Sequence, residues 1–222
     1  MSQKSQENLS MKEPPQFVQR FHGKIAVQDR IRMFDQMPAT IWLTGLSGAG
    51  KSTLAFALEE QLIALGHACY VLDGDNIRHG LASDLGFEPD DRRENIRRVA
   101  HVAQLMNDAG LIVISALISP LREDRAMARA IIGADKFVET YVSTSLATCA
   151  SRDPKGLYAK ARSGEISSFT GVSAPYEAPI DPDLNVDTGT LSPAQSVAQI
   201  FHYLREKCLG RSSHRSAHAA GA

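Results

Sequence analysis

The stretch GLSGAGKS, residues 45–52, has the composition and spacing of a phosphate-binding loop. It fits the pattern G-x-x-x-x-G-K-[ST] and lies between a short apolar run and an amphipathic stretch, which is the strand–loop–helix context that such a loop requires. Gly45, Gly48 and Gly50 allow the backbone N–H groups to point into one concavity, where phosphate oxygens replace water. The alternative is a glycine turn beside a solvated lysine, and the context favours the phosphate loop.

Three side chains at the end of this stretch are suited to a nucleoside triphosphate. Lys51 would reach the β- and γ-phosphates, the Ser52 hydroxyl would supply a ligand to Mg²⁺, and Thr53 would extend the set of donors. Such a loop identifies the phosphate donor but not the acceptor, because GTPases, ATPase motors and small-molecule kinases all share it.

The stretch VLDGDNIRHG, residues 71–80, places two carboxylates and an arginine directly after a second apolar run. Asp73 would stand at the tip of a strand, where it could hold a Mg²⁺-bound water or accept the proton of an attacking hydroxyl. Asp75, Asn76 and Arg78 would then face the acceptor. The alternative is an Asp-Gly turn with a helix N-cap at Asp75 or Asn76 and a solvated Arg78.

The continuation LGFEPDDRRENIRR, residues 85–98, concentrates arginines on one predicted helix beside Phe87 and Asn95. A guanidinium binds phosphate or sulfate oxygens in a bidentate way, and an aromatic ring nearby can stack on a base. Each arginine alone is equally typical of a solvated helix face, and Phe87 could instead pack in the core. The arginines concerned are Arg92, Arg93, Arg97 and Arg98.

These side chains need a scaffold that brings them together, and the apolar pattern predicts one. Short runs rich in β-branched residues alternate with amphipathic stretches, which indicates an α/β fold with a parallel sheet covered by helices on both faces. Ligands of such sheets bind at the carboxyl ends of the strands. The predicted strands are TIWLT (40–44), CYVLD (69–73), LIVISAL (111–117), FVETYVS (137–143) and LNVDT (184–188).

Helices are predicted between and after these strands. One runs from Lys51 to Leu65, and another spans residues 94–110 and ends at Gly110. Ser119-Pro120 and Ser192-Pro193 are each expected to open a helix, with serine as N-cap and proline at the first position. The segment QFVQRFHGKIAVQDRIRMF, residues 16–34, is interpreted as an amphipathic helix that packs on a neighbouring subunit.

Length and composition suit one soluble domain. The 222 residues are 43% hydrophobic and carry a formal charge of −1, which argues against a nucleic-acid partner. No apolar run approaches a membrane span, and the cysteines Cys69, Cys149 and Cys208 indicate buried thiols in a reducing cytoplasm. We expect disorder in residues 1–20, one domain at 21–209 and a disordered tail at 210–222.

Six motifs in the expected order give the chain a resemblance to the adenylyl-sulfate kinases over residues 36–205. They are GLSGAGKST, DGDNIR, LGF with DRRENIRR, ISP at 118–120, DPKGLYAKAR at 153–162 and FTG at 169–171. The resemblance implies a P-loop kinase, with Mg²⁺, that transfers the γ-phosphate of ATP to the 3′-hydroxyl of adenosine 5′-phosphosulfate (adenylyl sulfate). The product would be the activated sulfate donor PAPS, made in the cytoplasm.

The resemblance also implies roles for individual residues. It assigns residues 153–175, including Lys155, to a mobile lid whose alternative is a basic surface loop. An acceptor adenine would lie between Phe87 and Phe169. The ATP phosphates would lie on Gly48, Ala49, Gly50, Lys51, Ser52 and Thr53, and the acceptor nucleotide on Asp75, Asn76, Ile77, Arg78, Arg92, Asn95, Ile118 and Ser119.

Ser119 is labelled a phosphoserine intermediate by the same resemblance, whereas its position before Pro120 predicts a helix cap and a substrate contact instead. Leu117 departs from the aromatic residue of many relatives. A homodimer is implied, and a sulfurylase partner is a further possibility that the resemblance raises. Rival hypotheses are a gluconate or shikimate kinase and a silent nucleotide-binding subunit, although the silent subunit should have lost Lys51 or Asp73.

Overall fold

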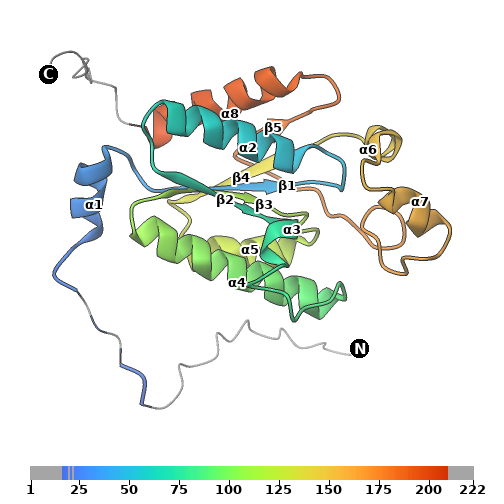
Figure 1. Cartoon of the computed structure of the whole chain (residues 1–222), viewed down its shortest axis with the longest axis horizontal. Helices are drawn as coiled ribbons and strands as arrows, with labels where there is room; N and C mark the ends of the chain where they lie inside the picture. Colours follow the sequence, from blue (N-terminus) through green and yellow to red (C-terminus); the bar gives the residue numbers. More distant parts are fainter. Residues whose placement is uncertain (1–16, 20, 22, 210–222) are drawn as a thin grey trace, which may run out of the picture.

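A parallel β-sheet forms the centre of the chain (Figure 1). The structure, a computed structural model, describes residues 17–19, 21 and 23–209. Within them the sheet has five strands in the order β2-β3-β1-β4-β5, and every pairing is parallel, as the sequence predicts. The strands are β1 (Thr40–Thr44), β2 (Cys69–Asp73), β3 (Ile112–Ala116), β4 (Phe137–Val142) and β5 (Leu184–Val186).

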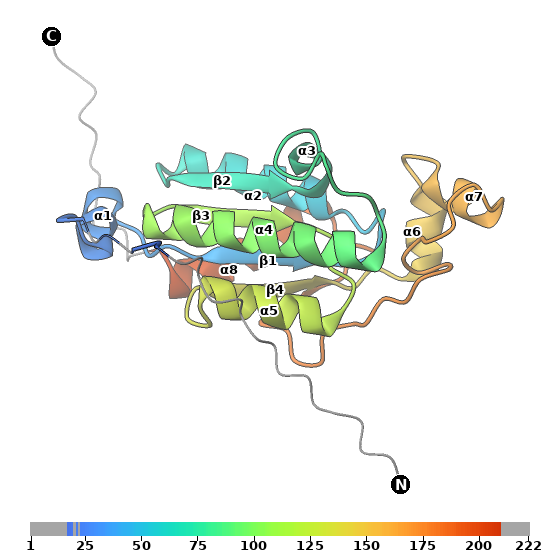
Figure 2. The same cartoon turned by 90° about the horizontal axis from the view of Figure 1, so that it is seen from below.

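Helices cover both faces of this sheet. The helices α2 and α8 pack on one face and α4 and α5 on the other, as the two perpendicular views show (Figures 1 and 2). The short helices α6 and α7 lie beyond the carboxyl ends of the strands. The bounds are α1 (Val27–Phe34), α2 (Lys51–Ala64), α3 (Gly74–Ile77), α4 (Pro89–Asp108), α5 (Arg122–Ile132), α6 (Leu146–Arg152), α7 (Leu157–Arg162) and α8 (Pro193–Lys207).

The core consists of two apolar layers, one on each side of the sheet. Every residue of β1 and β3 is buried because these strands have a neighbour on both sides and helices on both faces. Leu54, Leu58 and Leu62 of α2 fill one layer, and Val99 and Ala103 of α4 fill the other, at the helical spacing seen in the sequence.

Three sequence-based boundaries were wrong. Helix α5 begins at Arg122 rather than after Ser119, because Ser119 takes the left-handed backbone angle φ 39° and its hydroxyl and carbonyl bond elsewhere. Helix α4 begins five residues early, at Pro89, since proline is favoured in a first turn. Among the described residues of the predicted N-terminal helix, Val27–Phe34 alone are helical, and Asp29 accepts from the Ala26 N–H at the helix start.

The predictions for helix caps, cysteines and chain ends have separate outcomes. Ser192 caps α8, as predicted, and Gly110 lies just past α4 with φ 90°. Cys149 and Cys208 are buried thiols, while Cys69 is only half-buried. In the described part of the chain no helix is long and apolar enough to cross a membrane. The predicted disorder falls almost entirely outside the described residues, and the domain bounds 21–209 stay a prediction.

Asn107, fully buried on α4, fastens the start of β1 to the loop before β3. Its side-chain oxygen accepts from the Thr40 hydroxyl at 2.8 Å, and its amide nitrogen donates to the carbonyl oxygens of Ala39 at 3.0 Å and Leu111 at 3.1 Å. Buried polar groups need such partners, because leaving one unpaired costs free energy.

We predict that Asn107→Leu lowers the free energy of unfolding by about 3 kcal/mol, because it leaves the buried Thr40 hydroxyl without its acceptor and removes one donor each from the Ala39 and Leu111 carbonyl groups. Urea denaturation measures the change. Asp108→Ala, at the neighbouring exposed position, is the control and should change that free energy by less than about 0.5 kcal/mol. A leucine variant as stable as the control would contradict the anchoring role of Asn107.

Candidate functional site

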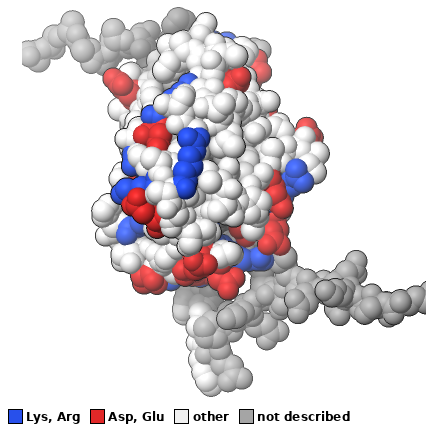
Figure 3. Space-filling model, turned by 90° about the vertical axis from the view of Figure 1, so that its right-hand side faces the viewer, with Lys and Arg blue, Asp and Glu red and all other residues white. Residues whose placement is uncertain are grey.

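A cavity of about 1430 Å³ opens at the carboxyl ends of the strands. Its walls come from the phosphate loop, α3, the start of α4, the turn at 117–120 and the segment 152–170. Figure 3 views the molecule from this end, where basic and acidic side chains are interspersed. Of the predicted site residues, the cavity is lined by Gly48, Gly50, Lys51, Ser52, Thr53, Asp73, Asp75, Arg78, Phe87, Arg92, Asn95, Ile118, Ser119, Lys155 and Phe169.

The phosphate loop requires glycine at two of its positions for steric reasons. Gly45 has φ 153° and Gly48 has φ 76°, and a Cβ atom would lie 2.6 Å from the Val142 carbonyl oxygen or 2.9 Å from that of Cys149. Gly45 and Ala49 do not line the cavity; both shape the loop from behind, and Ala49 is fully buried. The loop therefore packs closely against the end of β4 and against α6.

Lys51 lies at the first position of α2 with its side chain folded into the loop. Its Nζ donates to the carbonyl oxygens of Gly45 and Leu46, each at 2.8 Å. Burial lowers the pKa of the Lys51 ammonium to about 8, partly offset by the nearby Asp73 carboxylate. A buried ammonium with only carbonyl partners is well placed to meet anionic oxygens, because two carbonyl dipoles leave its charge incompletely neutralised.

Asp73 joins the second strand to the phosphate loop. Its Oδ2 accepts from the Ser52 hydroxyl at 2.7 Å, and its Oδ1 accepts from the N–H groups of Asp75 at 3.0 Å and Asn76 at 3.4 Å. Asp73 is thus the N-cap of α3, so the alternative that placed the cap at Asp75 or Asn76 was wrong. Strand β3 separates β1 from β2, and the contact with Ser52 spans that gap.

A hydroxyl and a carboxylate side by side fit a hard cation such as Mg²⁺. Mg²⁺ prefers oxygen donors and commonly takes one or two protein ligands while substrate phosphates and water supply the rest. The Ser52–Asp73 pair at the cavity wall matches that donor set. These two side chains therefore fit Mg²⁺, and the metal site stays a prediction.

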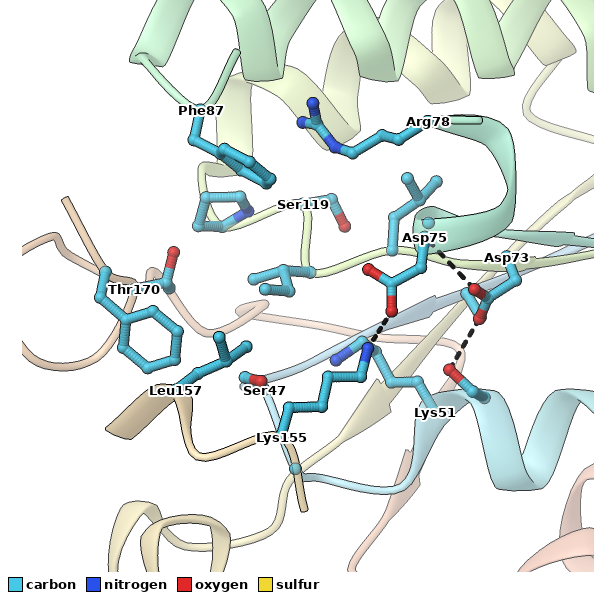
Figure 4. A pocket seen from close by; sticks show the side chains of 18 of the residues that line it. Ser47, Lys51, Asp73, Asp75, Arg78, Phe87, Ser119, Lys155, Leu157 and Thr170 are labelled. Atoms are coloured by element: carbon cyan, nitrogen blue, oxygen red, sulfur yellow. Dashed lines mark hydrogen bonds and ion pairs between the residues drawn. The ribbon is translucent and has the colours of Figure 1, made fainter. Parts of the chain in front are cut away.

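The cavity is bridged by an ion pair between Asp75 of α3 and Lys155 of the segment before α7 (Figure 4). Both side chains are more than half exposed, so the pair contributes little to stability. The neighbours of Asp75 point elsewhere: Asn76 is exposed outside the cavity, and Ile77 packs on the apolar layer under α4. Their predicted substrate contacts are therefore not through cavity-lining side chains.

Two aromatic rings line the cavity, as the sequence predicts. Phe87 is 63% exposed, and the guanidinium carbon of Arg78 lies 4.3 Å from its ring centroid. Arg78 also donates to the carbonyl oxygens of Leu85 and Gly86, which fixes the loop that carries Phe87. Phe169 rests edge-on against Tyr158, with ring centroids 4.9 Å apart. Phe87 is therefore largely exposed, whereas Phe169 is supported by the Tyr158 ring.

Helix α4 contributes two of its polar residues to the cavity. Arg92 donates to the Phe87 carbonyl, the Thr170 hydroxyl and the Ser168 carbonyl, so it joins the two segments that carry the aromatic rings. Asn95 is buried, and its Oδ1 has no hydrogen-bond partner among the described residues. The other arginines turn away from the cavity: Arg93 pairs with Glu123, Arg97 with Glu94, and Arg98 with Glu94 and Asp84.

Ser119 lines the cavity with a nearly buried side chain. Its hydroxyl accepts from the Trp42 indole N–H at 3.1 Å. The serine therefore contacts the sheet rather than capping α5.

Among the cavity residues that the sequence interpretation did not single out, Arg152 and Thr188 support the phosphate loop. Arg152 donates to the carbonyl and hydroxyl oxygens of Thr188, and Thr188 donates to the Ala49 carbonyl at 2.8 Å. This chain of bonds braces the phosphate loop from outside its motif. The position of Arg152 directly before DPKGLYAKAR was the available signal, and nothing in the sequence pattern marked Thr188.

Comparisons with known proteins agree with this geometry. The model of the adenylylsulphate kinase family matches residues 37–187. The adenylyl-sulfate kinase of Vibrio cholerae is 56% identical over 80% of this chain and 83% of its own, and that of Shewanella baltica is 59% identical over 76% and 82%. A solved structure of the Mycobacterium tuberculosis APS kinase with AMPPNP and APS is 48% identical, covers 76% of this chain and 98% of its own, and has a TM-score of 0.74.

The matched region contains the phosphate loop, α3, the cavity face of α4 and both aromatic rings. The family model, the curated relatives and the solved structure are all of adenylylsulphate kinases. The chain belongs to the adenylylsulphate kinase family.

Proposed function

We propose that the chain transfers the γ-phosphate of ATP to the 3′-hydroxyl of adenosine 5′-phosphosulfate, giving PAPS. The observation that carries this proposal is one continuous cavity with a phosphate loop at one end and two aromatic rings with Arg92 and Asn95 at the other. A volume of about 1430 Å³ exceeds the range of roughly 300 to 1,000 Å³ typical of small-molecule pockets. Such a volume suits two nucleotides.

ATP is assigned to the phosphate loop. The loop N–H groups, Lys51 and Thr53 would bind the phosphates, and Ser52 with Asp73 would hold Mg²⁺. When bound, Mg²⁺ neutralises charge that develops on the transferred phosphoryl group. Lys51 exchanges its loop carbonyl partners for phosphate oxygens, which raises the pKa of its ammonium again because an anion now faces it.

Adenylyl sulfate is assigned to the other end of the cavity. Its adenine lies against Phe87 and Phe169, and Asn95 Oδ1 accepts a hydrogen bond that no described residue of the chain supplies. Arg78 and Arg92 bring positive charge to the anionic group of the nucleotide. The remaining predicted contacts on this side that line the cavity are Asp75, Ile118, Ser119 and Lys155.

Transfer is direct, without a phosphoserine. The Ser119 hydroxyl is occupied by the Trp42 N–H and is nearly buried, whereas a serine nucleophile needs an adjacent base. Rate enhancement then comes from positioning and from charge stabilisation by the loop, Lys51 and the metal. Asp73 is more suited to the metal than to the role of a base, because both its oxygens already accept hydrogen bonds.

The segment 153–175 acts as a lid over both nucleotides. It carries Lys155 and Phe169 and is tied to α4 through Arg92 and to α3 through the Asp75–Lys155 pair. Closing it excludes water, which would otherwise accept the phosphoryl group. Cytoplasmic location, homodimer formation and a sulfurylase partner stay predictions from the sequence.

The rival kinases are less well supported. Gluconate and shikimate have no base to stack, so they leave the paired rings without a role. A silent regulatory subunit is disfavoured because Lys51 and Asp73 are both present and in contact with the loop.

We predict that the purified chain consumes ATP with adenylyl sulfate but not with gluconate or shikimate, and that mass spectrometry identifies PAPS as the product. The control is the Lys51→Ala variant. Its turnover should fall about 10²- to 10⁴-fold, because roughly 3 to 5 kcal/mol of charge stabilisation in the transition state is lost. Turnover with gluconate or shikimate, or full activity of a folded Lys51→Ala variant, would refute the assignment of adenylyl sulfate and ATP as substrates.

We predict that Asn95→Ala weakens adenylyl sulfate about tenfold and leaves ATP affinity within about twofold, since one buried hydrogen bond to a ligand is worth about 1.4 kcal/mol. Asn95 is a sharper probe than Arg92, which also holds the loop of Phe87. Arg97→Ala, on the same helix but outside the cavity, should change neither affinity. Calorimetric titration with each nucleotide decides, and equal losses for both ligands would mean that the two ends were assigned wrongly.

A further inference from the structure

Arg125 of α5 is a buried arginine whose guanidinium reaches three separate segments. The side chain is 2% exposed. Its Nε donates to the Glu139 carboxylate of β4, its Nη1 to the Ser119 carbonyl and its Nη2 to the Glu177 carbonyl, each at 2.7 Å. Burying a charge is costly unless it is paired and hydrogen-bonded, and Glu139 supplies the opposite charge.

The first carbonyl belongs to the turn that forms one wall of the cavity. Ser119 holds φ 39°, a left-handed conformation that residues other than glycine adopt only under constraint from their surroundings. The constraint is visible: Arg125 holds the Ser119 carbonyl, and the Thr44 hydroxyl donates to the Ile118 carbonyl at 2.7 Å. Ile118, Ser119 and Pro120 all line the cavity, whereas Arg125 does not.

The second carbonyl belongs to the chain that leaves the lid segment. The Glu177 carbonyl accepts from Arg125, and the Glu177 N–H donates to the Pro120 carbonyl at 2.9 Å. Tyr176 lies with its ring centroid 5.9 Å from the Arg125 guanidinium carbon, and its hydroxyl meets that of Thr44 at 3.0 Å. The end of the lid and the Ser119 turn are therefore fixed to each other and to β4 through one side chain.

We propose that Arg125 is a positioning residue for the acceptor nucleotide, acting through the Ser119 turn and the end of the lid. The inference rests on the proposed function, because it assumes that adenylyl sulfate binds against this turn. Its geometry requires the planar guanidinium: three donors must point in three directions from one buried centre, which the compact ammonium of lysine on its flexible stem cannot reproduce in the same space.

The test compares Arg125→Lys with Arg129→Lys. Arg129 lies one turn along α5 and approaches the same Glu139, but it pairs with Asp183 and bonds to neither carbonyl. We expect Arg125→Lys to raise the KM for adenylyl sulfate about tenfold, through two lost hydrogen bonds, with the KM for ATP within about twofold. Arg129→Lys should leave both KM values within about twofold, whatever its melting temperature.

The Tyr176→Phe variant provides a second KM measurement that does not depend on whether Arg125→Lys folds. It removes only the hydroxyl contact with Thr44, and we expect the KM for adenylyl sulfate to rise about threefold without loss of structure. Equal shifts in Arg125→Lys and Arg129→Lys, equal shifts for the two substrates, or an unchanged KM in Tyr176→Phe would overturn the positioning role. Wild type is measured first, so a chain inactive with adenylyl sulfate would refute the proposed function and not this inference.

Discussion

The hydrogen bond between the Ser52 hydroxyl and the Asp73 carboxylate is the contact on which the site depends. Parallel strands deliver their carboxyl ends to one edge of the sheet, but β3 lies between β1 and β2. The Ser52–Asp73 contact joins the start of α2 to the start of α3 across that gap. Because Asp73 also caps α3, the same carboxylate orients the segment that carries Asp75 and Arg78.

The walls of the cavity differ in how firmly they are held. The phosphate loop is braced from outside by Thr188 and Arg152, and the Ser119 turn by Trp42, Thr44 and Arg125. The lid side is held by Arg92, by Tyr158, which donates to the Ser47 carbonyl, and by an exposed ion pair from Lys155, which water screens. The exposed ion pair is the weakest of these contacts, and we propose that the lid segment 153–175 opens there while the wall formed by the phosphate loop stays fixed.

The sequence predicted those features that depend on local chemistry. The phosphate loop was predictable because only glycine tolerates the backbone at Gly45 and Gly48, and strand and helix types followed from apolar periodicity. The Ser119 cap was wrong because long-range contacts decided the conformation of the turn. Periodicity alone could not separate Arg92, which lines the cavity, from Arg97, which pairs within its own helix.

The order of the strands and the burial of Arg125 could not be predicted from local sequence patterns. Placing β3 between β1 and β2 is decided by how the whole chain packs, and REDRAMARA has the composition of a solvated helix although Arg125 is buried within it. Tyr158 supports Phe169 and donates to the Ser47 carbonyl at 2.9 Å, a role for which its place in DPKGLYAKAR was the only signal. Tertiary contacts therefore determined which candidate residues became site residues.

If one cavity holds two nucleotides at once, each nucleotide must bind while the other is already bound. Calorimetry would titrate adenylyl sulfate into the protein saturated with Mg²⁺ and a nonhydrolysable ATP analogue. We expect one further molecule of adenylyl sulfate to bind per chain, and the reverse titration should find one molecule of the analogue per chain saturated with adenylyl sulfate. Loss of adenylyl sulfate binding in the presence of saturating analogue would mean that the two nucleotides compete for one position and that the cavity does not hold both.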